Sequence, residues 1–107
     1  MTDLSKLTHY VIDELRATEE YKEYEANLAE LVKDRDLYYR VNEMREKNFK
    51  IQLSRNEDMM ELMDALTNEY EDVINLELVR NFLDSEAAVC RLFQEFHNTV
   101  TEGLEFN

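Results

Sequence analysis

The side chains that could bind a metal ion in this chain are two histidines, one cysteine and many carboxylates. Di-iron and di-manganese sites in helical bundles need a Glu-x-x-His motif on each of two helices. Gln94 lies three positions before His97, and Lys6 lies three positions before His9. Neither histidine therefore has the carboxylate partner that this chemistry requires, and the sequence predicts no such metal site.

Cys90 is the single cysteine and the one candidate thiol nucleophile. A catalytic thiol needs a nearby histidine or a helix N-terminus to lower its pKa, whereas His97 is two helical turns away, about 10 Å by helix rise. The apolar neighbours of Cys90 at helical spacing favour a buried structural cysteine. An iron–sulfur cluster takes several cysteines, so one chain could contribute to a cluster only across an oligomer. We predict no cofactor.

Motifs for other reactions are missing as well. The one glycine is Gly103, so a glycine-rich phosphate loop cannot form, and no G-x-S-x-G motif for a serine nucleophile occurs. Carboxylates are frequent, but on charged helix faces any two of them lie near each other by chance. The sequence predicts no catalytic residue and no enzyme.

The composition indicates an all-α protein. Proline is absent, strong helix formers dominate, and the turn residues that β folds need between short strands are almost lacking. No run approaches the roughly 18 apolar residues of a membrane span, and the first residues lack the layout of a signal peptide. One cysteine cannot form an internal disulfide, which fits a reducing compartment. We expect a cytoplasmic protein without membrane insertion.

Helix ends are read from capping residues and from changes in the apolar stripe, since glycine and proline mark none of them. We expect a first helix over about 3–17 and a second from Thr18, either separate from the first or only kinked. A third ends near Ser54, a fourth follows, and a long fifth helix reaches about Glu102. The expected N-terminal caps are Thr2, Asp34 or Asp36, Asn56 and Asn75.

The third and fourth helices carry heptad-like apolar seams, spaced 4, 3, 4, 3. The members are Leu37, Val41, Met44, Asn48 and Ile51 in the third helix, and Met59, Met63, Leu66, Tyr70 and Val73 in the fourth. Asn48 either fixes the register or lies exposed at the edge of its seam, and the cluster Met59, Met60 and Met63 favours core packing. We predict a single helical domain, residues 1–107, built as a bundle of about four to five helices with no strands.

The formal charge of −13 is unevenly distributed. Residues 1–55 carry −2 and residues 56–107 carry −11, while the segment 33–55 carries +3. Phosphate affinity comes largely from Lys and Arg, so we expect no direct nucleic-acid binding. The basic segment and the acidic second half are expected to pair with each other or with protein partners. Otherwise the acidic surface serves solubility.

Several apolar residues are adjacent in sequence, such as Val11–Ile12 and Phe82–Leu83. Adjacent helical residues point about 100° apart, so both members are buried only where a helix touches two neighbours. A chain of this size does not cover all such faces by itself, and we therefore expect a homodimer.

The basic third helix also carries aromatic residues. Arg40 and Lys47 are seven positions apart and share one face, while Arg45 and Phe49 lie four apart on another. Arginine and aromatic side chains are favoured at interfaces, so we predict partner contact through Tyr38, Arg40, Arg45, Lys47 and Phe49. The alternative is that this helix packs internally against the acidic fourth helix, its charges forming weak surface pairs.

The order of these features resembles the YlbF/YmcA family of small helical bacterial regulators. The family pattern is an apolar first helix, then Ser/Thr-x-Glu-Tyr, a spaced leucine and Lys-Asp before a long helix. Residues 18–52 match it with TEEYKEYEANLAELVKDRDLYYRVNEMREKNFKIQ, and the family's last helix after a characteristic asparagine is matched at residues 75–100 by NLELVRNFLDSEAAVCRLFQEFHNTV. The resemblance covers roughly residues 4–104.

The resemblance implies a self-associating fold of long helices and a non-enzymatic role in competence, sporulation and biofilm formation. It also implies protein partners in a complex that assists mRNA processing by a membrane-bound endoribonuclease. Some members with extra cysteines are associated with an iron–sulfur cluster, whereas this chain has Cys90 alone. We therefore expect a regulatory adaptor. An acidic decoy that mimics DNA is an alternative that the basic segment 33–55 opposes, and the methionine cluster suggests a chaperone-like helical holder.

Overall fold

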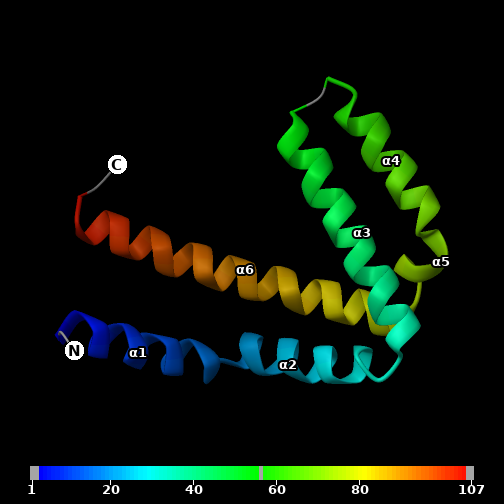
Figure 1. The fold of residues 1–107 in the computed structure, drawn as a ribbon. Coiled ribbons are helices and arrows are strands. Elements are labelled where there is room, and N and C mark those ends of the chain that lie inside the picture. Colours follow the sequence, from blue (N-terminus) through cyan, green and yellow to red (C-terminus); the bar gives the residue numbers. More distant parts are fainter. Residues whose placement is uncertain (1–2, 56, 106–107) are drawn as a thin grey trace. The chain divides into compact units, whose positions relative to one another are not determined.

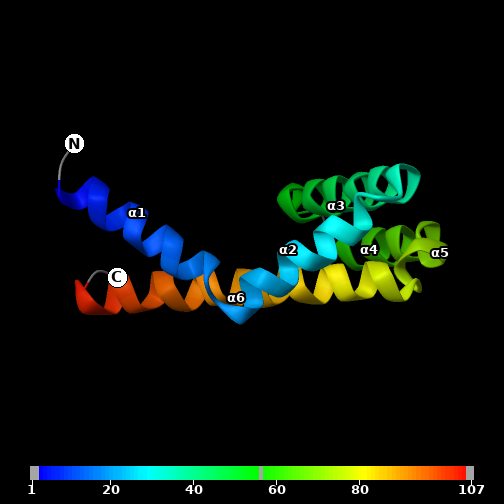
Figure 2. The same cartoon turned by 90° about the horizontal axis from the view of Figure 1, so that it is seen from below.

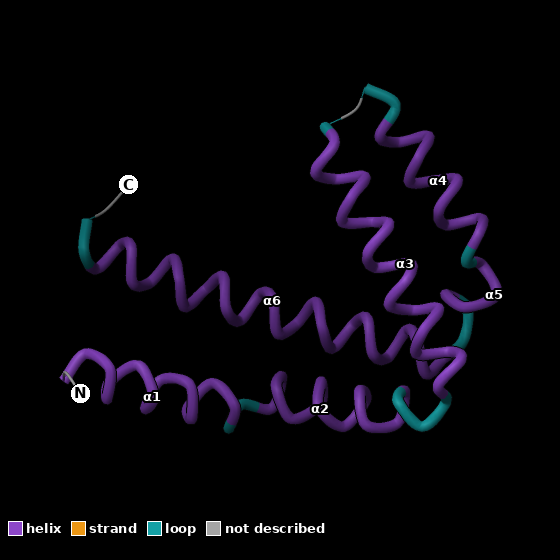
Figure 3. Tube along the Cα trace, in the orientation of Figure 1, coloured by secondary structure: helices purple, strands orange, loops and turns teal. Residues whose placement is uncertain are grey.

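The computed structural model of the chain describes residues 3–55 and 57–105, and helices take up 87% of it (Figure 3). The described residues contain no strand, which confirms the all-α prediction. No helix within them is both long and apolar enough to cross a membrane. The helices are α1 (Asp3–Arg16), α2 (Glu19–Leu31), α3 (Arg35–Ser54), α4 (Met59–Glu69), α5 (Glu71–Ile74) and α6 (Glu77–Gly103).

The helix ends in the first half follow local capping chemistry. The first two helices are separate, and the Thr18 hydroxyl accepts a hydrogen bond from the Tyr21 backbone N–H at the start of α2. Asp34 is the N-cap of α3, where its carboxylate accepts from the Leu37 backbone N–H. A carboxylate at this position satisfies one of the unpaired amides of the first turn. The caps expected at Thr2 and Asn56 lie outside the described residues.

The fourth expected helix ends earlier than its seam predicts. Tyr70 leaves the helical conformation with φ −109° and ψ 20°, and it separates α4 from the short helix α5. The prediction that Asn75 caps the last helix is wrong. The Asn75 backbone N–H donates to the Glu71 carbonyl and closes α5, and α6 begins two residues later at Glu77.

The chain divides into two compact units. Unit 1 comprises residues 1–27 and 83–107, and unit 2 comprises residues 28–82. Both boundaries fall inside helices, one within α2 and one within α6. The single domain 1–107 stays a prediction, and coincident unfolding transitions from probes in the two units would support it.

Unit 2 holds most of the buried side chains. In it α3 and α4 run antiparallel as a hairpin, with α5 directly after α4 (Figure 1). The seam residues of both helices are buried or half-buried, which confirms the predicted seams. The buried apolar side chains of unit 2 are Leu31, Val41, Met44, Leu66, Tyr70, Val73, Val79 and Phe82.

Unit 1 is much more open. Here α1 and the C-terminal part of α6 run antiparallel, and α1 diverges from α6 toward its own N-terminus (Figures 1 and 2). Near the other end, the Asn27 side-chain amide donates to the Ser85 hydroxyl at 3.2 Å. Ser85 and Val89 are the buried residues among those described in unit 1, and α1, which is described throughout, has none.

Large apolar side chains lie exposed along α1 and the C-terminal part of α6 in unit 1, and we call seven of them the open stripe. Their exposed fractions range from 38% at Ile12 to 73% at Leu4 and Leu104. The open stripe comprises Leu4, Leu7 and Ile12 in α1, Phe93, Phe96 and Val100 in α6, and Leu104 directly after α6.

Two predictions about burial are corrected by this arrangement. Cys90 is exposed and not buried, and none of the described residues of α6 beyond Val89 is buried. Met60 is 80% exposed, so it is not a core residue, whereas Met59 and Met63 are half-buried. A residue of the apolar stripe is buried only where a neighbouring helix covers it.

Candidate protein-contact surface on α3

The five predicted contact residues lie on two flanks of α3. The spacing of seven places Arg40 and Lys47 over the same face of the helix. Lys47 pairs with Glu69, the last residue of α4, and Arg40 pairs with Asp72 in α5. We call Arg40, Glu43 and Lys47 the inner flank. By helical spacing, Tyr38, Arg45 and Phe49 fall on the opposite side of α3, and we call these three the outer flank.

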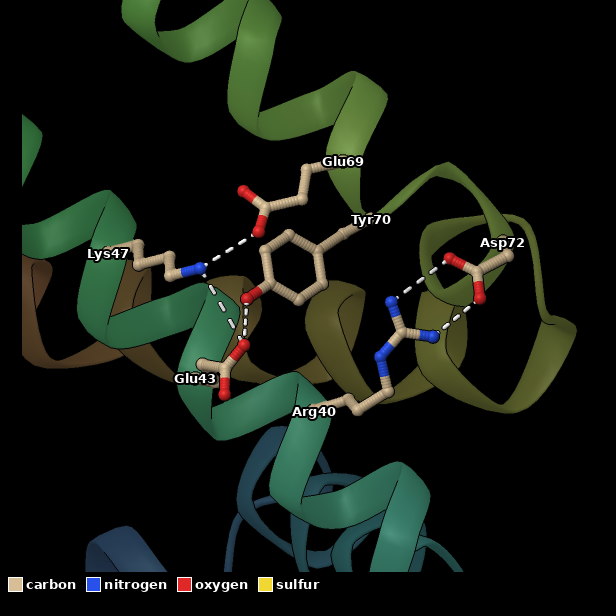
Figure 4. A network of polar contacts seen from close by, with 6 residues as sticks. All are labelled: Arg40, Glu43, Lys47, Glu69, Tyr70 and Asp72. Atoms are coloured by element: carbon tan, nitrogen blue, oxygen red, sulfur yellow. Dashed lines mark hydrogen bonds and ion pairs between the residues drawn. The ribbon is translucent and has the colours of Figure 1, made fainter.

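The three side chains of the inner flank surround Tyr70, the residue between α4 and α5 (Figure 4). The Arg40 guanidinium carbon lies 5.4 Å from the centre of the Tyr70 ring, and the Lys47 ammonium nitrogen lies 5.1 Å from it. The Tyr70 hydroxyl donates a short hydrogen bond to a Glu43 carboxylate oxygen. Because the ring is buried and its polar end is satisfied, Tyr70 contributes both apolar burial and orientation.

Ion pairs join the inner flank to the acidic residues around Tyr70 (Figure 4). Lys47 Nζ lies 2.9 Å from Glu69 Oε1 and 3.6 Å from Glu43 Oε1. Arg40 binds the Asp72 carboxylate through both terminal nitrogens, the longer bond being 3.3 Å. The expected pairing of the basic segment with the acidic second half is therefore confirmed for Arg40 and Lys47.

These contacts shift the pKa values of their members. The hydrogen bond from Tyr70 lowers the pKa of Glu43, and the hydrogen bonds from Arg40 lower the pKa of Asp72. Hydrogen bonds to Tyr70 and Glu69 raise the pKa of Lys47. Burial of the Tyr70 phenol, followed by its bond to Glu43, raises the pKa of that hydroxyl. Each shift favours the protonation state that the network contains at neutral pH.

Sequence reasoning missed Tyr70, Glu69 and Asp72. A tyrosine in place of an aliphatic seam residue is the signal that could have located the network, because a buried hydroxyl usually finds a polar partner. The tyrosine alone does not say which of several charged residues on α3 supplies that partner.

The outer flank is arranged differently. The Arg45 guanidinium carbon lies 5.5 Å from the centre of the buried Phe82 ring, and Arg45 Nη1 donates to Asn42 Oδ1 at 3.1 Å. Phe49 is 61% exposed, and Tyr38 is half-buried. An arginine held in place beside an exposed aromatic side chain is a common composition at protein interfaces.

A shallow open groove of about 370 Å³ lies between α3 and α4. Four of its lining residues are apolar and three are charged, among them the paired Lys47 and Glu69. The lining residues are Lys47, Lys50, Ile51, Leu62, Ala65, Leu66 and Glu69. Because Lys47 is already paired within the chain, the groove gains little charge from it for recognising a partner.

Groups suited to metal or thiol chemistry are not gathered in the described residues. His9, Cys90 and His97 are all exposed there. No three histidine, cysteine or acidic side chains in the described ranges are placed to hold a metal ion together. Asn48, whose role the sequence leaves open, is half-buried, and its amide oxygen accepts from Gln52 at 3.4 Å.

Comparison with known proteins identifies a family. The family model described as "Control of competence regulator ComK, YlbF/YmcA" matches residues 5–105, which is nearly the whole chain. No curated protein and no solved structure matches the chain.

Proposed function

Because the chain belongs to the YlbF/YmcA family of competence regulators, we propose that it is a non-enzymatic regulatory adaptor of the cytoplasm. It acts by binding other proteins, and it does so as a homodimer. The family description supports a regulatory role in the control of ComK. The adaptor mechanism is our inference from the architecture, in which the described residues offer paired charges and exposed apolar surface rather than an assembled reactive site.

The outer flank of α3 is the proposed partner-contact surface. Phe49, 61% exposed beside Arg45, is the observation that carries this assignment. Association that covers Phe49 gains roughly 25 cal/mol for each Å² of apolar surface removed from water. Arg40 and Lys47 lie on the inner flank and support the outer flank indirectly, since their ion pairs with Asp72 and Glu69 join α3 to α5 and α4.

The partners that we propose are proteins of a complex that assists mRNA processing, with effects on competence, sporulation and biofilm formation. In such a complex the nucleic acid is bound by another subunit. The acidic decoy is the weaker alternative, because Glu69 and Asp72 from the acidic second half are engaged within the chain. Their charge is therefore partly neutralised and contributes less to a phosphate-like surface.

The test compares two aromatic residues of α3 that are similarly exposed. Phe49→Ala alters the outer flank, while Tyr39→Ala removes a side chain that is 68% exposed elsewhere on the same helix. Affinity capture from the native cytosol, with mass spectrometry of the bound proteins, is expected to show partner loss for Phe49→Ala and for Arg45→Glu. Truncating a central interface residue typically weakens binding by about 2 kcal/mol or more, roughly 30-fold.

Tyr39→Ala is the control and should capture the same partners as the unchanged chain. Lys47→Glu tests whether Lys47 has a structural role or a binding role. The change puts a third carboxylate beside those of Glu43 and Glu69, and the repulsion among them should lower thermal stability. Lower stability with unchanged partner capture assigns Lys47 a structural role. Full partner capture by Phe49→Ala and Arg45→Glu would place the contact surface elsewhere.

A further inference from the structure

The groove between α3 and α4 is lined by one row of side chains from each helix. The row on α4 has the positions i, i+3, i+4 and i+7, which are neighbours on one face of a helix. In coiled-coil packing, four neighbouring side chains of this kind form the hole that receives a side chain of the facing helix. The row on α4 is Leu62, Ala65, Leu66 and Glu69.

The row on α3 has the same spacing. Lys47, Lys50 and Ile51 occupy the positions i, i+3 and i+4. Because α3 and α4 are neighbouring antiparallel helices (Figure 1), the two rows run along the two sides of the groove. This arrangement suits a third helix that inserts apolar side chains spaced i, i+3, i+4 and i+7 into a groove.

Apolar surface in the groove is still accessible to a partner. Leu62 is 38% exposed, Ala65 is exposed, and Ile51 is half-buried. Ala65 ends in a single methyl group, so another helix can approach α4 closely at this position. Covering these side chains removes apolar surface from water, which favours association.

The charge on α4 and α5 favours a cationic occupant. The two helices carry five acidic and no basic side chains. Two of the five carboxylates pair with cations of α3. The other three are exposed and form no ion pair with the residues that the structure describes, and they are Glu61, Asp64 and Glu71.

The two lysines of the groove do not cancel this negative charge. Lys47 lies 3.6 Å from Glu43, and Lys50 lies 3.1 Å from Glu46, so α3 itself supplies a carboxylate for each of them. Positive groups of a partner are therefore attracted to the α4 side of the groove and negative groups are repelled. The same sign of charge opposes nucleic acid as the occupant.

We propose that the groove between α3 and α4 binds a basic amphipathic helix of a partner protein. The apolar side of that helix packs on Ile51, Leu62 and Ala65, and its lysine or arginine side chains lie near Glu61, one helical turn before Ala65. This inference rests on the adaptor role of the proposed function. It adds a second contact surface to the outer flank of α3 and states the chemistry of its partner.

Fluorescence anisotropy with the purified full chain tests the proposal. The probe is a labelled synthetic peptide of about 18 residues, long enough to form a helix, with leucine at i, i+3, i+4 and i+7 and lysine on both sides of that stripe. We expect saturable binding that weakens as the salt concentration rises. The same peptide with glutamate in place of lysine should not bind, and a scrambled peptide without the apolar stripe should bind at least about tenfold more weakly.

Leu62→Ala and Met60→Ala are a matched pair of changes on α4. The two positions are two residues apart, so they point to nearly opposite sides of the helix, and Met60 is 80% exposed outside the groove. Leu62→Ala should weaken binding of the lysine peptide about tenfold, whereas Met60→Ala should leave it unchanged. Ala65→Lys puts a cation inside the groove and should weaken binding at least as much. Circular dichroism shows whether each variant folds.

No binding by the unchanged chain, equal binding by the two alanine variants, or undiminished binding by Ala65→Lys would overturn the proposal. Equal binding of the glutamate peptide would do the same. If Ala65→Lys lowers the mass of the peptide-free chain in light scattering, a second copy occupies the groove and the proposal is wrong. Phe49 does not line the groove, so failure here is distinct from failure of the adaptor function, which partner capture by Phe49→Ala tests.

Discussion

Units 1 and 2 are built from similar amphipathic helices, yet they bury their apolar faces to different degrees. In unit 2 the hairpin of α3 and α4 covers residues such as Val41 and Val73, and the Tyr70 network joins the two sides. In unit 1, Phe96 and Val100 on a comparable helical stripe are 42% and 41% exposed. An amphipathic pattern thus identifies the apolar face of a helix, while the packing of the rest of the fold decides whether that face is buried.

Within unit 2 the ion pairs differ in what they contact. In unit 2 the ion pairs of Arg40 and Lys47 surround a buried ring, where their side chains are partly ordered by packing. Exposed pairs such as Lys33–Glu30 at 2.9 Å contribute little, because water and salt screen them. The Tyr70 network therefore fixes geometry more than it adds stability.

The largest effect is expected from Phe82→Ala in unit 2. Phe82 is fully buried, and truncating such a side chain typically costs about 3–5 kcal/mol. Urea unfolding followed by circular dichroism should show this loss at every protein concentration. Phe96→Ala in unit 1 should cost less than about 1 kcal/mol, because the Phe96 side chain is 42% exposed and leaves no buried cavity. Equal losses of stability in the two variants would contradict the difference between the units.

A smaller loss is expected from Tyr70→Phe, which keeps the ring between the two cations and removes the hydroxyl. Losing one intramolecular hydrogen bond of a buried phenol typically costs about 1 kcal/mol. Tyr39→Phe is the control, since Tyr39 is 68% exposed, and it should leave the urea midpoint unchanged. If the two variants unfold alike, the Tyr70 hydroxyl has no stabilising role.

The smallest effect is the acid dependence of unit 2. The pKa values of Glu43 and Asp72 are lowered in the folded chain from ordinary values of 4.5 and 3.8. Their contribution to stability is therefore present above those ordinary values and is lost as the pH falls through the lowered ones. The urea midpoint should be flat near neutral pH and decrease below about pH 4.5.

Asp72→Asn gives the matched comparison for this acid dependence. Without the carboxylate that Arg40 binds, the decrease at low pH should be shallower than in the unchanged chain. Asp64→Asn, at an exposed position of α4, is the control and should retain the full slope. An identical slope in all three proteins would mean that the Asp72 pair does not contribute to stability.

Much of the fold follows from the sequence because helix formation is largely local. The absence of proline and the cap at Asp34 predict the helices of the first half, and the seams through Met44 and Leu66 predict which faces are buried. The contact surface follows less directly. The spacing places Arg40 with Lys47 and Arg45 with Phe49, but it does not reveal that the first pair is engaged around Tyr70.

By itself, the sequence determined the all-helical class, most of the helices and the uneven charge, since these depend on residue type and short-range spacing. The tertiary structure alone decided that the chain leaves its helix at Tyr70, that Asn75 ends α5, and that Cys90 is exposed. Each of these depends on how the helices pack and not on the residue alone. A heptad pattern looks the same on a covered and an uncovered helix, and only the packing of the neighbouring helices distinguishes the two.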